Sequence, residues 1–173
     1  MALIRSCRNN TPKIHETCWL ADNATIVGEV TMGENCSVWF NAVVRGDVNS
    51  IEMGNNVNIQ DGAVIHCTYE KTKVKLGNNV SIGHNALVHG CTVENNVLIG
   101  MGAIVMDNCY IEENCIIAAG AVLLEGTRVQ SGSVYAGVPA KKVKDLSPEL
   151  FKGEVMRIAQ NYRMYASWFE QES

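Results

Sequence analysis

Aliphatic residues recur at every sixth position through most of this chain. The register is unbroken from Val93 onward: Val93, Ile99, Val105, Ile111, Ile117, Leu123 and Val129, with Tyr135 as its last member. The same register runs earlier, through 14–44, 53–65 and 76–88. An α-helix repeats every 3.6 residues and a strand every two, so neither produces a sustained period of six. This period predicts a parallel β-helix, a solenoid of short strands.

The repeat has the form [LIV]-[GAED]-x-x-[STAV]-x over roughly residues 14–140 and resembles the hexapeptide-repeat superfamily. That resemblance implies an all-β solenoid, a left-handed parallel β-helix with three hexapeptides per coil. It sorts the aliphatic positions onto three faces, which begin at Ile26, Val44, Ile65, Val88, Val105 and Leu123; at Leu20, Val38, Ile59, Ile82, Ile99 and Ile117; and at Ile14, Met32, Met53, Leu76, Val93 and Ile111. Insertions near residues 47–52 and over 67–75 interrupt the coil, and such irregularities are often functional.

A different pattern follows the repeats. We therefore divide the chain into a β-helix domain, residues 1–140, and a C-terminal segment, residues 141–173. Ser147-Pro148 is typical of a helix N-cap and first helical residue. Apolar residues then recur at three- and four-residue spacing: Phe151, Val155, Ile158, Tyr162, Tyr165 and Phe169. They predict one α-helix over about residues 147–170 that packs along the prism or against a neighbouring subunit.

Composition excludes several functions. The 173 residues carry a net charge of −4 and no basic stripe, so we expect no nucleic-acid binding. No stretch approaches ~18 uninterrupted apolar residues, and the first ten residues lack the apolar core of a signal peptide. We therefore expect a cytoplasmic protein without membrane attachment. The seven cysteines include no CxxC pair, which favours free buried thiols over disulfides or a Cys-type zinc site.

Three of the four histidines lie in neighbouring coils. His66 and His89 each take the second place of a hexapeptide on the same face, one coil apart. Adjacent coils are about 4.8 Å apart, so these imidazoles can bind one ion. His84 lies on the next face, and we expect it to complete the site of a neighbouring chain in a cyclic trimer. The alternative is that these histidines are satisfied structural groups, and His15 is expected to be a surface histidine.

Polar residues surround the predicted metal position: Arg45, Asp47, Asn58, Gln60 and Asp61. Arg45 stands in the column of His66 one coil earlier, and Asp61 takes the position of His84 one coil earlier. An Arg45–Asp47 pair there would lock the trimer and orient the metal ligands. The alternative is a surface salt bridge, which contributes little to stability.

Together, Arg45-Gly46-Asp47, Asn58-Ile59-Gln60-Asp61, His66 and His84-x4-His89-Gly90 resemble the motif set of γ-class carbonic anhydrases. The resemblance implies that His66, His84 and His89 bind Zn²⁺, with Fe²⁺ or Co²⁺ as alternatives, at homotrimer interfaces. A metal-bound hydroxide would hydrate CO₂ to bicarbonate. It also implies catalytic or interface roles. Gln60 would position the metal-bound solvent, Asn58 would line the CO₂ pocket, and Arg45, Asp47 and Asp61 would lie at the interface. Tyr162 matches a site tyrosine that this family's C-terminal helix can supply.

One departure concerns proton transfer. Characterised family members carry glutamates near the site, where this chain has Val48 and Tyr69, with Glu70 next door on the inserted loop. Neither Val48 nor Tyr69 can shuttle a proton as a carboxylate would. We therefore expect slow turnover or another substrate. Three other functions stay open: a hexapeptide acyltransferase that uses acyl-CoA, a metal-dependent hydrolase of CoA thioesters, and a non-catalytic trimeric metal-binding scaffold.

Overall fold

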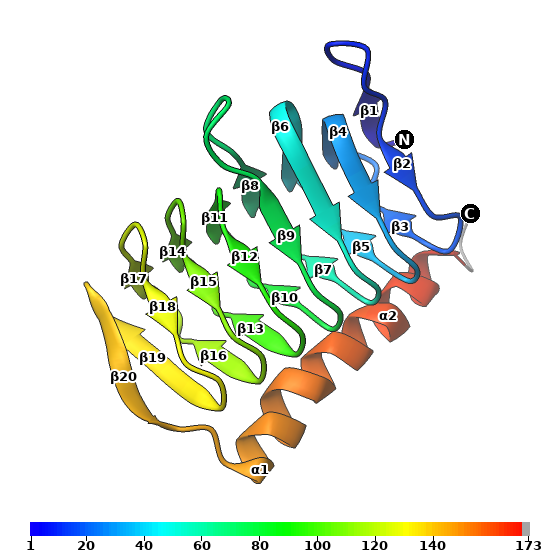
Figure 1. Cartoon of the computed structure of the whole chain (residues 1–173). Coiled ribbons are helices and arrows are strands. Elements are labelled where there is room, and N and C mark those ends of the chain that lie inside the picture. The colour runs from blue at the N-terminus through cyan, green and yellow to red at the C-terminus, as the bar shows by residue number, and fades with distance from the viewer. Residues whose placement is uncertain (171–173) are drawn as a thin grey trace.

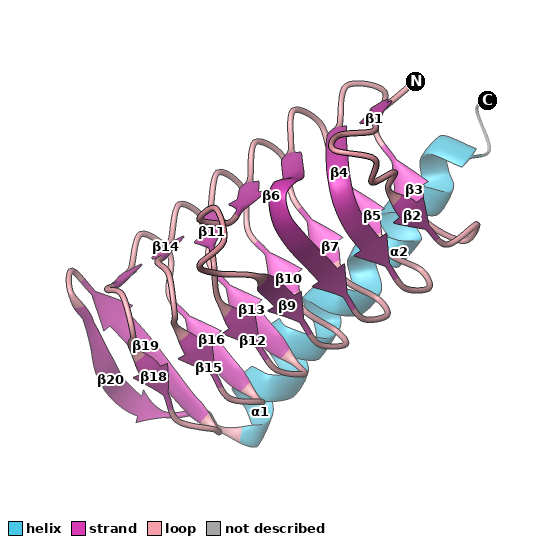
Figure 2. Cartoon of the chain, turned by 45° about the horizontal axis from the view of Figure 1, so that its top comes forward, coloured by secondary structure: helices cyan, strands magenta, loops and turns pink. Residues whose placement is uncertain are grey.

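A three-sided coil of short parallel strands forms most of the molecule, and one long helix runs back along its side (Figure 1). This arrangement comes from a computed structural model that describes residues 1–170. Figure 2 shows the strands stacked coil upon coil, with the loops at the corners of the prism. Each coil therefore buries its aliphatic positions against the coils before and after it, as the period of six predicts.

The first face, which we call the histidine face, carries β1 (Leu3–Arg5), β8 (Val64–His66), β11 (Leu87–His89), β14 (Ile104–Val105) and β17 (Val122–Leu123). The helix face, against which the C-terminal helix lies, carries β3 (Trp19–Leu20), β5 (Ser37–Val38), β7 (Asn58–Ile59), β10 (Ser81–Ile82), β13 (Val97–Ile99), β16 (Cys115–Ile117) and β19 (Ser133–Gly137). The third face carries β2 (Lys13–Ile14), β9 (Val74–Leu76), β12 (Thr92–Val93), β15 (Tyr110–Ile111) and β18 (Arg128–Val129). Two longer strands, β4 (Thr25–Met32) and β6 (Val43–Met53), turn a corner and serve two faces.

The strand register confirms the predicted assignment of residues to faces. On the histidine face, Val44 pairs with Ile65, Ile65 with Val88, and Val88 with Val105. The equivalent ladders on the other faces run through Ile59, Ile82 and Ile99 and through Met53, Leu76 and Val93. These side chains are almost completely buried, so the core is a stack of aliphatic layers along the prism axis.

The two predicted insertions differ in structure. Residues 67–73 form a loop between β8 and β9. The insertion near residues 47–52 does not leave the sheet, because β6 continues through it. The pairing of β6 with β4 shifts instead, from Gly28 opposite Gly46 to Val30 opposite Ile51. Gly46 permits this bend, since a Cβ atom there would lie 2.5 Å from the carbonyl oxygen of Glu29.

Asparagines occupy corners of the prism in the left-handed backbone region, which asparagine tolerates better than most residues. Four of them stack along one corner through side-chain hydrogen bonds of 2.8–3.0 Å: Asn56, Asn79, Asn96 and Asn114. The amides of the first three each donate to the side-chain carbonyl of the asparagine in the next coil. Many of the asparagines of this chain therefore have a structural role, because they form the turns between strands and link successive coils.

At the predicted domain boundary, β20 (Ala140–Asp145) pairs antiparallel with β19 at the end of the coil. Ser147 then caps α1 (Pro148–Leu150), as predicted, and a π-helical turn η1 (Phe151–Met156) leads into α2 (Arg157–Glu170). Near its end, α2 packs Phe169 against Trp19, Trp39 and Phe40. Within residues 1–170, no helix is long and apolar enough to cross a bilayer.

Truncation of a core layer tests this account of the fold. Ile117 is completely buried, two coils beyond Ile82 on the helix face, so Ile117→Ala is expected to lower the free energy of unfolding by about 2–5 kcal/mol. Leu124→Ala is the matched control, because Leu124 is 51% exposed and its truncation should change stability by less than about 0.5 kcal/mol. Chemical denaturation measures both. Equal effects of the two substitutions would contradict the assigned layers.

Candidate metal centre

His66 and His89 lie side by side on the histidine face. They occupy paired positions of β8 and β11, and their ring centroids are 5.1 Å apart. The Nδ1 atom of His66 lies 3.1 Å from the Nε2 atom of His89. Two nitrogens bound to one tetrahedral ion at 2.0–2.1 Å lie about 3.3 Å apart. The pair is therefore spaced as two ligands of one metal ion would be.

Each of the three candidate ligands is held by an aspartate of its own. The carboxylate of Asp47 lies 3.1 Å from Nε2 of His66, Asp61 lies 2.9 Å from Nδ1 of His84, and Asp107 lies 2.5 Å from Nδ1 of His89. A carboxylate that holds the second nitrogen of an imidazole is the usual support of a metal-ligating histidine. The donor set therefore fits a divalent ion such as zinc.

His84 stands apart from this pair, in the turn between β10 and β11. Its Nδ1 faces Asp61, and its Nε2 lies 3.2 Å from the hydroxyl of Tyr162 on α2. Among residues 1–170, no three histidine, cysteine, aspartate or glutamate side chains gather into a metal site within one chain. His84 and the His66–His89 pair are thus two separate parts of the predicted ligand set.

The predicted residues Asn58 and Gln60 are brought to His84 within the same chain. Gln60 Oε1 accepts a hydrogen bond from the backbone N–H of His84 at 3.2 Å. Its amide nitrogen donates to Asn58 Oδ1 at 3.0 Å, and Asn58 in turn donates to Ser81 at 2.7 Å. Both amides are almost fully buried. This chain of hydrogen bonds fixes the turn from which His84 projects.

Arg45 and Asp47 form an ion pair beside His66. The Nη1 atom of Arg45 lies 2.5 Å from Asp47 Oδ2. Burial raises the pKa of Asp47, but hydrogen bonds from Arg45 and His66 outweigh it and hold that pKa below its usual value. Burial also lowers the pKa of His66, which favours the neutral imidazole that metals bind. The sequence placed Asp47 near the ligands, and the structure makes it a direct partner of His66.

A cleft of about 390 Å³ lies between α2 and the helix face, beside His84. Its walls are largely apolar and include Leu98, Met101 and Ile116 from the coil and Ile158, Tyr162 and Tyr165 from the helix. Burial, together with the nearby Asp61 carboxylate, raises the pKa of Tyr162 to about 12. Its hydroxyl therefore stays protonated at neutral pH and can donate a hydrogen bond beside His84, on the wall of this cleft.

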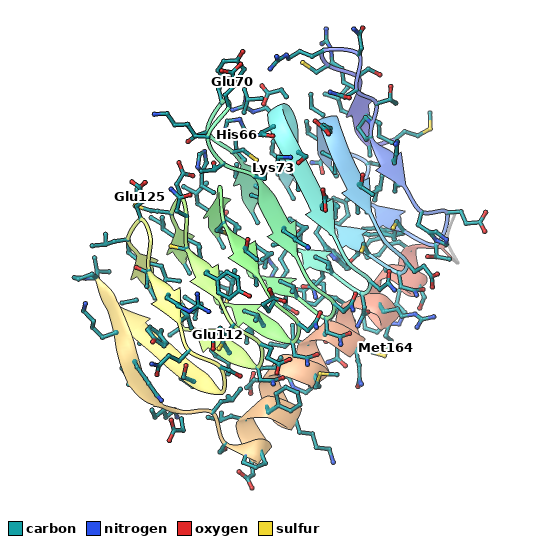
Figure 3. The ribbon with its side chains drawn as sticks, viewed as in Figure 1. His66, Glu70, Lys73, Glu112, Glu125 and Met164 are labelled. Atoms are coloured by element: carbon teal, nitrogen blue, oxygen red, sulfur yellow. The ribbon has the colours of Figure 1, made fainter. Side chains whose placement is uncertain are left out.

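Sequence reasoning missed Asp107 and the two threonines that bind it. Thr68 donates to Asp107 Oδ2 at 2.5 Å, and Thr72 lies 3.4 Å from Oδ1. The available signal was positional, because Asp107 follows Val105 in the next coil of the histidine face. Figure 3 shows His66 at the base of the loop that carries Glu70 and Lys73, the loop from which the threonines come.

Known proteins provide a further comparison. The family model "Bacterial transferase hexapeptide (six repeats)" matches residues 11–46 and 90–125. A carbonic anhydrase of Geobacillus kaustophilus is 38% identical over 160 residues, which cover 92% of this chain and 87% of that protein. The mitochondrial gamma carbonic anhydrase 2 of Arabidopsis thaliana is 36% identical over 91% of this chain, which spans 57% of that relative's length. The chain belongs to the γ-carbonic anhydrase-like, hexapeptide-repeat family.

A solved structure shows the same hexapeptide-repeat fold. The hexapeptide transferase family protein of Anaplasma phagocytophilum has a TM-score of 0.92 and 37% identity, and the match covers 96% of this chain and 98% of that one. The predicted fold class is thereby confirmed: this γ-carbonic anhydrase-like chain is a left-handed parallel β-helix with a C-terminal α-helix.

Val48 and Tyr69 occupy the two positions where γ-class carbonic anhydrases are expected to carry glutamates. Val48 packs against the core. The side chain of Tyr69 is 49% exposed, and the guanidinium carbon of Arg8 lies 5.1 Å from its ring centroid. Neither position offers a carboxylate to the His66–His89 pair. The structure therefore agrees with the sequence in placing no proton-transferring glutamate at these two positions.

Proposed function

We propose that this chain forms a homotrimeric, metal-dependent enzyme that hydrates CO₂ to bicarbonate. The ion would be held by His66 and His89 of one copy and His84 of another. The observation that carries this proposal is the set of three histidines, each held by its own aspartate, with two imidazole nitrogens 3.1 Å apart. Membership of the γ-carbonic anhydrase-like family supports it.

Zinc, with iron or cobalt as alternatives, would lower the pKa of water at such a site to about 7 and so supply hydroxide at neutral pH. The residues of the chain prepare the site for this chemistry. Asp47, Asp61 and Asp107 orient the imidazoles, and Arg45 offsets the charge of Asp47. Gln60 and Asn58 fix the turn of His84, while the protonated Tyr162 hydroxyl can donate to a bound anion.

Stopped-flow CO₂ hydration with zinc-loaded and iron-loaded protein tests this function. We expect activity that depends on the metal and is lost in His66→Ala and His89→Ala. The control is His15→Ala, because the His15 ring bonds to Thr17 two residues away and lies outside the proposed ligand set. Absence of activity in both metal forms would disprove CO₂ hydration as the function, whatever the metal content.

The missing carboxylates at positions 48 and 69 predict a dependence on buffer. Proton removal from the site would rely on an external base, so turnover is expected to rise several-fold as imidazole buffer increases from about 5 to 100 mM. Val48→Glu should weaken this dependence if it supplies an internal carboxylate. The dependence is measured as kcat against imidazole concentration at constant ionic strength. A kcat independent of buffer would show that Glu70 or another group already shuttles the proton.

A second candidate function is hydrolysis of an organic ester or thioester by the same metal site. The cleft beside His84 favours it, since about 390 Å³ is far more space than CO₂ needs and falls within the usual range for small organic ligands. Release of p-nitrophenol from its acetate ester, and of free thiol from acetyl-CoA, by zinc-loaded protein tests this candidate. Transfer of the acetyl group to an amine without any metal would instead indicate an acyltransferase. Tight zinc binding without any of these activities would indicate a scaffold.

A further inference from the structure

The loop over residues 67–73 is fastened to the coil by one carboxylate. Thr68 donates a hydrogen bond to Asp107 Oδ2 at 2.5 Å, and Thr72 lies 3.4 Å from Oδ1. Within the loop, the backbone N–H of Thr68 donates to the Thr72 hydroxyl at 2.9 Å, and Thr72 is buried. Asp107 itself follows β14, one coil beyond His89. It therefore joins two segments that are far apart in the sequence.

The same carboxylate meets His89, with Asp107 Oδ1 2.5 Å from Nδ1. An ionised carboxylate can only accept hydrogen bonds, so the proton of a neutral His89 ring must sit on Nδ1. The lone pair then sits on Nε2, the atom that lies 3.1 Å from Nδ1 of His66. Asp107 thus selects both the tautomer and the direction of this imidazole.

Gly90 provides the space for this arrangement. A Cβ atom at Gly90 would lie 2.1 Å from Asp107 Oδ1 and 2.2 Å from Thr72 Oγ1, and the residue has a φ of +51°. Only a glycine lets the carboxylate and the loop hydroxyl approach the backbone next to His89 so closely. The contact between loop, carboxylate and imidazole is therefore built into the backbone as well as the side chains.

We infer that Asp107 is a positioning residue for metal binding, and that Thr68 and Thr72 couple the 67–73 loop to metal affinity by holding its carboxylate. This inference rests on the proposed function, since it assigns His89 to a metal ion. The loop then acts on the ion through a chain of three contacts, without contributing a ligand. If Asp107 only anchored the loop, its replacement would leave the tautomer of His89 and the zinc affinity unchanged.

Zinc competition with a chromophoric chelator tests the inference on the full chain. Asp107→Asn keeps the shape but loses the charge-assisted hydrogen bond, and we expect zinc affinity to fall about 10–100-fold. Thr68→Val leaves the carboxylate in place and should weaken zinc binding by a smaller factor. Asp145→Asn is the matched control, because the Asp145 carboxylate pairs with Lys142 at the surface of β20, and its replacement should leave the zinc affinity unchanged.

A second readout separates positioning from simple anchoring. ¹⁵N NMR of the metal-free protein should show His89 protonated on Nδ1, with a mixture of tautomers in Asp107→Asn. An unchanged tautomer together with zinc affinity within about twofold of wild type would overturn the inference. If wild-type protein binds no zinc, the proposed function fails by itself. The tautomer then still decides: a shift supports the control of His89 by Asp107, and no shift rejects it.

Discussion

Replacement of His84 by alanine is expected to remove zinc from the protein while leaving its β-helix folded. His84 projects from a turn, and its side chain is 39% exposed, so truncation opens no cavity in the core. Loss of one of three imidazoles should nevertheless weaken metal binding by several orders of magnitude, because two neutral ligands hold zinc poorly. Elemental analysis gives the zinc content per chain, and circular dichroism monitors the fold. His15→Ala is the control and should keep its zinc.

Mixing two inactive variants tests whether the site is shared between copies. His84→Ala chains retain the His66–His89 pair, and His89→Ala chains retain His84. If the ligands come from neighbouring subunits of a cyclic trimer, random co-assembly restores about one quarter of the sites. No recovery of zinc in the mixture would contradict a shared site. Full zinc content in His84→Ala alone would show that His84 is not a ligand.

Gly90→Ala is expected to have the second largest effect. The new methyl group would meet Asp107 Oδ1 at 2.1 Å and the Cβ of Thr72 at 2.7 Å, so the carboxylate and the loop must both move. That movement breaks hydrogen bonds to a charged group worth about 1.5–3 kcal/mol each, and the left-handed backbone adds about 1–2 kcal/mol. We expect a loss of several kcal/mol in the free energy of unfolding, together with weaker zinc binding.

Gly120→Ala is the control for the backbone part of this effect. Gly120 has a similar φ of +67°, but a Cβ atom there meets nothing within 4 Å. The two substitutions thus share the conformational cost and differ in the contact with Asp107. Thermal and urea unfolding of both variants, with zinc titration, isolates that contact. Equal destabilisation by the two would contradict the importance of the crowded site at Gly90.

The assignment of residues to the faces of the prism was predictable because it follows from the six-residue repeat of aliphatic residues. Once three hexapeptides form a coil, Ile65 and Val88 must pair, and His66 and His89 follow as neighbours. The helix start was equally local, since Ser147 and Pro148 determine it without reference to the rest of the chain. Predictions of this kind depend on residues that are close in sequence or on a repeat that makes distant residues equivalent.

The contacts that hold the histidines and the helix in place were harder to predict, because they involve segments that depart from the six-residue repeat. The contacts of Thr68 and Thr72 with Asp107 depend on the path of a non-repeating loop. The bulge in β6 keeps residues 47–52 in the sheet, where the break in the six-residue register suggested an excursion. Likewise, the side of the prism taken by α2 depends on aromatic contacts of Phe169 with Trp19 and Trp39, which no single segment encodes. Each of these features arises from the meeting of segments far apart in the chain.

The helix that runs back along the coil also links the number of coils to the identity of the residue beside His84. One additional coil beyond β13 would lengthen the prism by about 4.8 Å and move the start of the helix away by the same distance. Because a helix rises 1.5 Å per residue, the residue that reaches His84 would then lie about three positions later. In this chain that residue is Tyr165, which already contacts Tyr162 on the same side of the helix. Tyr162 and Tyr165 are thus separated along the helix by about the height of one coil. A solenoid with one more coil would therefore still place a tyrosine hydroxyl beside His84.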